Sequence, residues 1–127
     1  MAYMADAQLR AGAIGDALET IEQALIFNPE DAIERPETLR IRGEIRLKLG
    51  DSQLAEADFR DSIAMARGMS AKAWELRTTM SLARLLDSQG RRQEARTMLA
   101  DIYNWFTEGF DTADLIDAKA LLEKLVE

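Results

Sequence analysis

The sequence predicts an all-α fold, a right-handed superhelical array of antiparallel helix hairpins with about seven helices. Three observations lead to this prediction. The 127 residues include only two prolines, Pro29 and Pro36, and the remainder is rich in residues that favour helices. No stretch shows the sustained two-residue period of a strand bounded by turn residues. Four glycines, at positions 12, 50, 90 and 109, each follow an apolar helical pattern, where glycine readily adopts the left-handed conformation that ends a helix.

The expected helices follow from these stops and from the residues that begin each element. They cover residues 2–11, 14–27, 37–49, 52–67, 71–89, 92–106 and 112–126. Pro36 suits the first turn of the third helix, because that turn has no intrahelical partner for a backbone N–H. Asp51 or Ser52 can cap the fourth helix, and Asp111 or Thr112 the seventh. The short connections favour antiparallel neighbours.

An internal repeat is anchored on Gly12, Gly50 and Gly90. Five residues after each glycine lies an alanine, and four residues further lies a large apolar residue. These pairs are Ala17 with Ile21, Ala55 with Phe59 and Ala95 with Leu99. The alanine lets the second helix of a hairpin approach the first closely, and the larger residue lies on the same helical stripe. Because one hairpin cannot bury this stripe alone, the hairpins must stack. We expect one domain, 1–127, with units at about 1–35, 36–69 and 70–108 and a capping helix at 112–126.

This pattern resembles the tetratricopeptide repeat (TPR). The positions that carry the resemblance are Gly12, Ala17, Ile21, Ala24, Leu25 and Pro29 in the first unit, Leu39 and Gly43 in the second, and Leu82, Ala83 and Leu86 in the third. The intervals from Gly12 to Gly50 and from Gly50 to Gly90 both exceed the TPR period of about 34 residues, which implies longer helices or connections. Arg42 and Arg46 stand where the family pattern has apolar or aromatic residues.

A second resemblance covers about residues 36–127. The matching segments are Leu39–Glu44, Ala73–Arg77, Ser81–Leu85, Gln89–Arg91, Trp105–Thr112 and, after Leu115, Ala118–Leu122. They are similar to the C-terminal TPR region of large bacterial proteins that join a class III adenylate or guanylate cyclase domain to a predicted ATPase. The resemblance implies a fragment or a stand-alone relative that lacks both catalytic domains, so neither activity is carried over.

Composition argues against most enzyme chemistries. The chain has no Cys and no His, so thiol nucleophiles, imidazole bases and the usual zinc ligands are absent. No phosphate-binding glycine motif occurs, and we place Asp58 and Asp61 on a solvated helix face rather than in an acid–base pair. The net charge of −7 argues against nucleic acid and anionic membranes as partners. We expect a cytoplasmic chain that is not an enzyme and has no catalytic residue, cofactor or metal.

The TPR resemblance also implies a partner-binding surface, because the first helix of each pair lines the concave face in that family. The positions carried over are Glu37, Arg40, Glu44, Leu47, Lys48, Arg77, Met80, Arg84 and Asp87. The arginines make this surface more basic than the whole chain, which favours a protein or peptide partner of acidic character. The alternative is that the arginines pair with nearby glutamates of adjacent helices.

The resulting prediction is a non-catalytic protein-interaction or scaffold module, the regulatory or docking region of a larger signalling protein. An alternative is a small-ligand or nucleotide-binding regulator with a pocket around Arg40, Arg77 and Arg84, and a third is a rigid spacer that binds nothing. Residues 1–27 would expose an apolar stripe, so we also expect self-association there. The aromatic residues Tyr103, Trp105, Phe106 and Phe110 are expected to pack the last hairpin.

Overall fold

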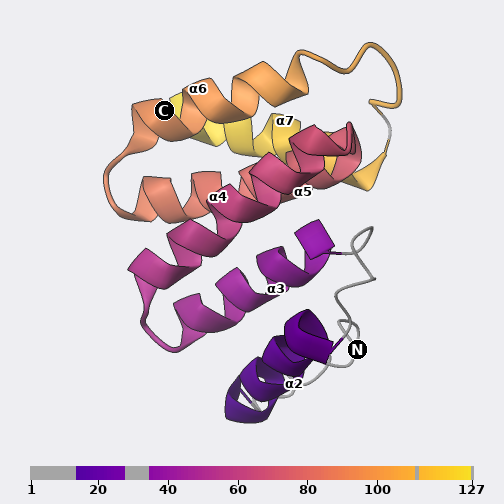
Figure 1. Ribbon diagram of the computed structural model, residues 1–127. Helices are drawn as coiled ribbons and strands as arrows, with labels where there is room; N and C mark the ends of the chain where they lie inside the picture. Colours follow the sequence, from indigo (N-terminus) through magenta and orange to yellow (C-terminus); the bar gives the residue numbers. More distant parts are fainter. Residues whose placement is uncertain (1–13, 28–34, 111, 127) are drawn as a thin grey trace. The chain divides into compact units, whose positions relative to one another are not determined.

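The computed structural model describes residues 14–27, 35–110 and 112–126, and all regular structure in these ranges is helical. The helices are α2 (Ile14–Phe27), α3 (Arg35–Lys48), α4 (Ser52–Gly68), α5 (Lys72–Ser88), α6 (Arg92–Tyr103) and α7 (Ala113–Val126) (Figure 1). The all-α prediction is therefore confirmed for this part of the chain, whereas the helix expected at 2–11 lies outside the described residues. The chain forms two compact units, Met1–Met65 and Ala66–Glu127, whose boundary lies inside α4.

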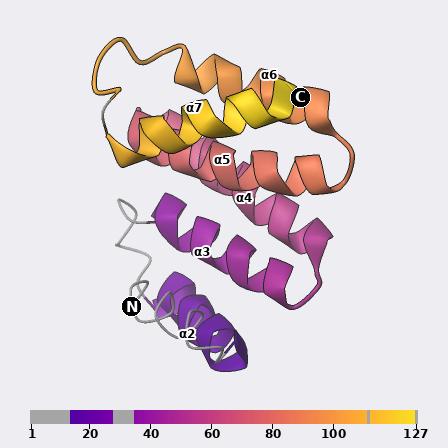
Figure 2. The same cartoon turned by 180° about the vertical axis from the view of Figure 1, so that it is seen from behind.

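In the first unit, α3 is the central helix. Helix α2 packs against it, and α3 and α4 form an antiparallel hairpin joined by a tight turn (Figures 1 and 2). Each helix contributes at least one fully buried large side chain, namely Ile21 from α2, Ile45 from α3 and Phe59 from α4. The apolar stripe expected on the second helices is therefore in the core.

In the second unit, α5 is the central helix, and both α6 and α7 pack against it and against each other. Its burial reflects this position, because ten of its residues are buried. The largest fully buried apolar side chains of this unit are Leu76, Leu82, Leu86, Leu99 and Leu125. A helix with two neighbours needs apolar or small residues on more than one face, and the α5 sequence supplies them.

The repeat register predicted from the glycines is confirmed at the positions that the structure describes. Ala55 and Ala95 are fully buried, and so are Phe59 and Leu99 four residues after them. Ile21 is buried in the same way in α2, while the side chain of its companion, Ala17, lies outside the described residues. The small residues face a neighbouring helix, as close approach of helices within a hairpin requires.

The long repeat period comes from long helices rather than long turns. Helices α4 and α5 have 17 residues each, and three residues separate α3 from α4, α4 from α5 and α5 from α6. These long helices with short turns account for the wide spacing of Gly50 and Gly90.

Three helices end in the same left-handed turn. Gly50 and Gly90 have φ values of 85° and 78°, and after α3 the N–H of Asp51 donates to the carbonyl of Arg46 and that of Gly50 to Leu47. This is the Schellman arrangement. The turn after α4 has the same hydrogen bonds, but its left-handed residue is Ser70, with a φ of 55°. The sequence has no glycine there, so its pattern predicted the end of α4 but not this conformation.

Two predictions about the C-terminal part are corrected. Helix α6 ends at Tyr103 rather than 106, because the N–H groups of Trp105 and Phe106 donate three residues back, in tighter turns than an α-helix has. Gly109 does have a positive φ, 80°, but it lies within the connection to α7 and does not end a helix. At the start of α4, the Oδ1 atom of Asp51 accepts a hydrogen bond from the N–H of Leu54 (3.2 Å), which confirms Asp51 as the cap.

Candidate partner-binding surface

Five of the nine residues predicted to contact a partner lie on α3. Each lies three or four residues from another member of the set, so they share one face of the helix: Glu37, Arg40, Glu44, Leu47 and Lys48. Lys48 is exposed and the other four are half-buried. The spacing that the TPR resemblance implies is therefore present as a continuous, water-accessible stripe on α3, here called the α3 stripe.

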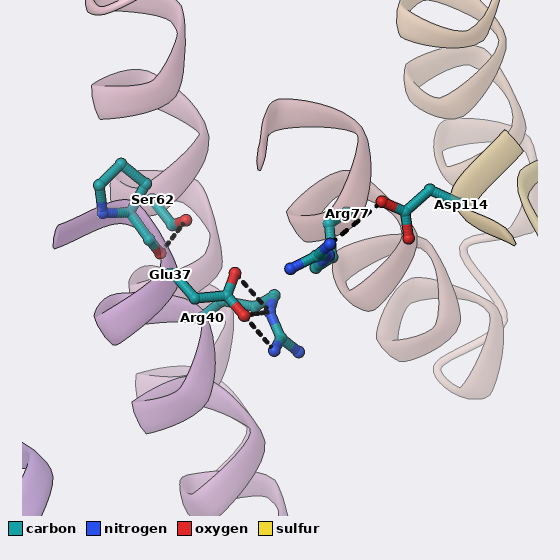
Figure 3. Close-up of polar contacts among 6 residues, drawn as sticks. Glu37, Arg40, Ser62, Arg77 and Asp114 are labelled. Carbon is teal, nitrogen blue, oxygen red and sulfur yellow. Dashed lines mark hydrogen bonds and ion pairs between the residues drawn. The ribbon is translucent and has the colours of Figure 1, made fainter. Parts of the chain in front are cut away.

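Arg40 forms an ion pair with Glu37 of the same helix. Its Nη2 atom lies 2.6 Å from Oε1 of Glu37, and its Nε atom lies 3.2 Å from both carboxylate oxygens (Figure 3). The two side chains are largely shielded from water, which strengthens the pair relative to a fully exposed one. The α3 stripe therefore offers an ion pair, not an isolated positive charge, at this position.

The remaining four predicted residues lie on α5, again on one face of the helix, here called the α5 stripe: Arg77, Met80, Arg84 and Asp87. Met80 is only 3% exposed, so its side chain is not open to a partner in this structure. Nη2 of Arg77 lies 3.2 Å from Oδ2 of Asp114 on α7 (Figure 3). Nε of Arg92 on α6 lies 3.1 Å from Oδ1 of Asp87.

Arg84 differs from the other charged residues of the α5 stripe. It is exposed, and within the described ranges the structure shows no ion pair for it. Arg77 is held by a carboxylate 37 positions away in the sequence, a partner that no local spacing rule predicts. Two arginines of the predicted surface therefore do pair with carboxylates. Arg40 pairs with Glu37 of its own helix and Arg77 with Asp114 of α7, whereas the alternative prediction was pairing with glutamates of adjacent helices.

Sequence reasoning missed a buried ionic cluster in the first unit. The Asp58 side chain is 2% exposed and accepts hydrogen bonds from Nε and Nη2 of Arg42 (3.1 and 2.7 Å) and from Nη1 of Arg46 (3.0 Å). Placing Asp58 on a solvated face was therefore wrong, whereas Asp61 is exposed as expected. Arg42 and Arg46 explain the departure from the family pattern, because their two positive charges satisfy a buried carboxylate where the family has apolar contacts.

A second buried polar contact joins the two helices of the same hairpin. The hydroxyl of Ser62 donates to the backbone carbonyl of Pro36 at 2.6 Å, between α4 and the first turn of α3 (Figure 3). Ser62 is fully buried. A buried hydroxyl is tolerated when it has a hydrogen-bond partner, so this contact is structural.

The C-terminal aromatic residues are less buried than expected. Tyr103 and Phe110 have ring centroids 5.8 Å apart, and Trp105 and Phe106 have theirs 5.1 Å apart. Trp105 and Phe110 nevertheless remain 57% and 46% exposed. The expectation that the whole cluster packs the last hairpin is therefore only partly met, and these rings leave apolar surface accessible next to α7.

The described residues also bear on metal binding and on membranes. They contain no group of three or more acidic, His or Cys residues arranged to hold a metal ion. Of the six described helices, none is both long enough and apolar enough to cross a bilayer.

Comparison with solved structures identifies the type of fold. Among solved structures, the chain is similar to the Yersinia enterocolitica type III secretion translocator chaperone SycD, with a TM-score of 0.74 and 19% sequence identity. The similarity covers 98% of this chain and 80% of that one. No family model matches the chain, and no curated protein matches it. The likeness, together with the antiparallel hairpins, shows a TPR-like helical-repeat fold.

Proposed function

We propose that the chain is a non-catalytic module that binds partner protein through the α3 stripe and through the accessible residues of the α5 stripe, Arg77, Arg84 and Asp87. The observation that supports this most is the TPR-like fold itself, because each hairpin presents the equivalent face of its first helix. The α3 stripe and the α5 stripe occupy the same register in successive repeats, with Glu37 equivalent to Arg77 and Glu44 to Arg84.

The charges on the two stripes determine what kind of partner they favour. Arg40 and Arg77 already have carboxylate partners, so a bound segment must compete with Glu37 and Asp114 for them. Arg84 and Lys48 are exposed, and they are the groups that an incoming carboxylate reaches first. We therefore propose acidic partner segments for each stripe by itself. On the α3 stripe a carboxylate pairs with Lys48 and exchanges with the Glu37–Arg40 pair, and on the α5 stripe a carboxylate pairs with Arg84 and exchanges with the Arg77–Asp114 pair.

The neighbour's description adds to this proposal. SycD is a type III secretion translocator chaperone. A chaperone-like or scaffold role suits the present chain on physical grounds, because side chains on the helices of a repeat fold can hold another polypeptide without any catalytic group.

The proposed setting is a larger bacterial signalling protein. This proposal rests on the resemblance of segments within residues 36–127 described in the sequence analysis, since no family model and no curated protein matches the chain. The bound segment would then belong to a catalytic domain of the same polypeptide or to a separate partner. Co-expression of the chain with such domains, followed by affinity capture, tests this setting.

The binding surface is tested by charge reversal. Purified wild-type chain and the variant Arg40→Glu/Arg84→Glu are used to select from a displayed library of random peptides, and the affinities of the selected peptides are then measured. We expect the wild type to select acidic peptides and the variant to lose them by at least about tenfold, the effect of about 1.4 kcal/mol. The matched control is Arg60→Glu/Arg96→Glu, which makes the same charge change at exposed positions of α4 and α6.

Equal binding by wild type, variant and control contradicts the proposed surface. The small-ligand alternative is examined by calorimetry with ATP and with a cyclic nucleotide. Heat of binding that Arg40→Glu/Arg84→Glu abolishes favours the regulator with an arginine-lined pocket, and it contradicts a module that binds only protein.

A further inference from the structure

Helix α7 has an outer face that nothing in the described residues covers. Five of the exposed residues of α7 follow one another along one side of the helix: Ile116, Lys119, Ala120, Glu123 and Val126. Ile116 is 53% exposed and Val126 is 66% exposed. The opposite face, with Leu121 and Leu125, is buried in the second unit. The capping helix expected from the sequence is thus not uniformly polar on its outer side.

A groove runs along this outer face. It has a volume of about 650 Å³ and is lined by Tyr103, Phe110, Ile116, Lys119, Ala120 and Glu123. The paired rings of Tyr103 and Phe110 form its wall on the side of the connection between α6 and α7. An apolar floor with one positive and one negative group at its edge suits an amphipathic helix.

The outer face is complementary to a reversed copy of itself. From its N-terminal end it carries an apolar residue, a cation, a small residue, an anion and an apolar residue. Two such helices can lie antiparallel, related by a twofold axis that crosses them at the level of position 121. Ile116 of one copy then meets Val126 of the other, and Lys119 of one copy meets Glu123 of the other. Ala120 lies close to the axis, where a small side chain permits close approach of two helices.

From this complementarity we propose that α7 is a homodimerisation helix whose groove binds α7 of a second copy of the chain. A twofold axis brings the same patch of each copy together, so the two Lys119–Glu123 pairs form at once, whereas a parallel arrangement places like charges together. Within the described ranges the structure shows no ion pair for Lys119 or Glu123, so both are available. Because each copy contributes a single helix and its groove, the dimer is expected to be concentration-dependent.

Sedimentation equilibrium of the full chain, from low to high micromolar concentration, tests this proposal. We expect a reversible monomer–dimer equilibrium for the wild type. Ile116→Lys introduces two charges into the apolar contact and is expected to weaken the dimer at least about tenfold. The control, Ile116→Val, keeps the contact apolar and leaves the equilibrium nearly unchanged. Circular dichroism checks that each variant keeps its helices.

The charge pairs allow a sharper experiment. Lys119→Glu places carboxylates at both positions 119 and 123, and Glu123→Lys places ammonium groups at both, so each variant alone repels its own copy. Mixing the two variants restores the pairing of opposite charges, and we expect a heterodimer to form at concentrations where each variant alone is monomeric.

Three results would overturn the proposal. They are a wild type that stays monomeric throughout, a dimer unaffected by Ile116→Lys, and variants that fail to associate when mixed. A dimer insensitive to all α7 changes instead indicates self-association elsewhere, such as the predicted contact through residues 1–27. The proposal does not rest on the proposed function, because the α3 and α5 stripes are not involved.

Discussion

The ring of Phe59 fills the space into which any side chain at Gly43 would extend. A Cβ atom at position 43 would lie 2.5 Å from Cε1 and 2.8 Å from Cδ1 of that ring. These distances are far below van der Waals contact, and Phe59 is fully buried, so the ring cannot withdraw into water. The close packing of Phe59 from α4 against α3 therefore depends on a glycine in the middle of a helix, where glycine is otherwise unfavourable.

We expect Gly43→Ala to lower the free energy of unfolding by about 1–3 kcal/mol, the usual effect of overpacking a core. Urea denaturation measures the change. The control is Gly68→Ala at the end of α4, where a Cβ atom would have no neighbour within 4 Å. There, the gain in helix propensity is expected to stabilise the protein by about 0.5–1 kcal/mol.

The α5–α6 hairpin suggests a compensating change at the contact between positions 43 and 59. Ala83 and Leu99 occupy the positions equivalent to Gly43 and Phe59, and both are fully buried. We expect Gly43→Ala/Phe59→Leu to be more stable than the sum of the two single changes predicts, by about 0.5–3 kcal/mol in a double-mutant cycle. Additive effects would contradict the direct contact between the two positions.

Removing the buried carboxylate of Asp58 leaves Arg42 without the carboxylate it binds in α4 and leaves Arg46 with only the more distant Glu22, whose Oε1 atom lies 3.9 Å from Nη2 of Arg46. We expect Asp58→Ala to lower the free energy of unfolding by about 3 kcal/mol, at the lower end of the range for a broken buried pair, because Arg42 and Arg46 retain some contact with water. Chemical denaturation checks this value. A change below about 0.5 kcal/mol, typical of a surface substitution, would show that the cluster is not part of the core.

The apolar equivalent of this cluster also exists in the chain. In the next repeat, the positions equivalent to Arg42, Arg46 and Asp58 hold Leu82, Leu86 and Met98. We therefore expect Arg42→Leu/Arg46→Leu/Asp58→Met to be as stable as the wild type or more so, since well-packed apolar residues often replace buried ion pairs without loss. A triple variant as unstable as Asp58→Ala would mean that the α3–α4 hairpin requires the charges.

The left-handed Ser70 provides a stabilising substitution. For a residue with a Cβ atom this conformation is less favourable by about 1–2 kcal/mol, whereas glycine adopts it freely. We expect Ser70→Gly to raise the free energy of unfolding by about 1 kcal/mol after the greater chain entropy of unfolded glycine is subtracted. Ser70→Ala keeps the Cβ atom and should give no such gain, and thermal denaturation of the three proteins compares them.

The small residue of the repeat register offers another test of packing. Ala55 is fully buried, whereas Ala57 in the same helix is exposed. Replacing Ala55 with leucine should cost about 1–3 kcal/mol by overpacking the core around it, and Ala57→Leu should change stability by less than about 0.5 kcal/mol. An unchanged urea midpoint for Ala55→Leu would contradict the register.

Local patterns were sufficient to predict most of the fold. Glycines 50 and 90 identify two helix ends, because their conformational freedom is a property of the residue itself. The alanine and large apolar positions identify the buried stripe, because helical spacing alone brings them onto one face. Gly109 misled the same reasoning, since a left-handed glycine within a connection has the same sequence signal as one that ends a helix.

The candidate surface was predictable only in its spacing. The residues of the α3 and α5 stripes follow from helical periodicity. Which of their charges remain available to a partner, however, depends on which residues form ion pairs within the protein. Arg77 meets Asp114 and Arg42 meets Asp58 across 37 and 16 positions of sequence, distances at which no local rule selects one carboxylate among many.

The amino-acid sequence by itself therefore determined the six described helices, their approximate ends and the apolar stripe that is buried, because these depend on interactions within a few residues. Tertiary structure alone decided that Asp58 is buried between two arginines, that Met80 is closed to a partner and that α7 presents Ile116 and Val126 outward. Each of these outcomes depends on which helix faces cover one another, and that is settled by packing between segments far apart in the chain.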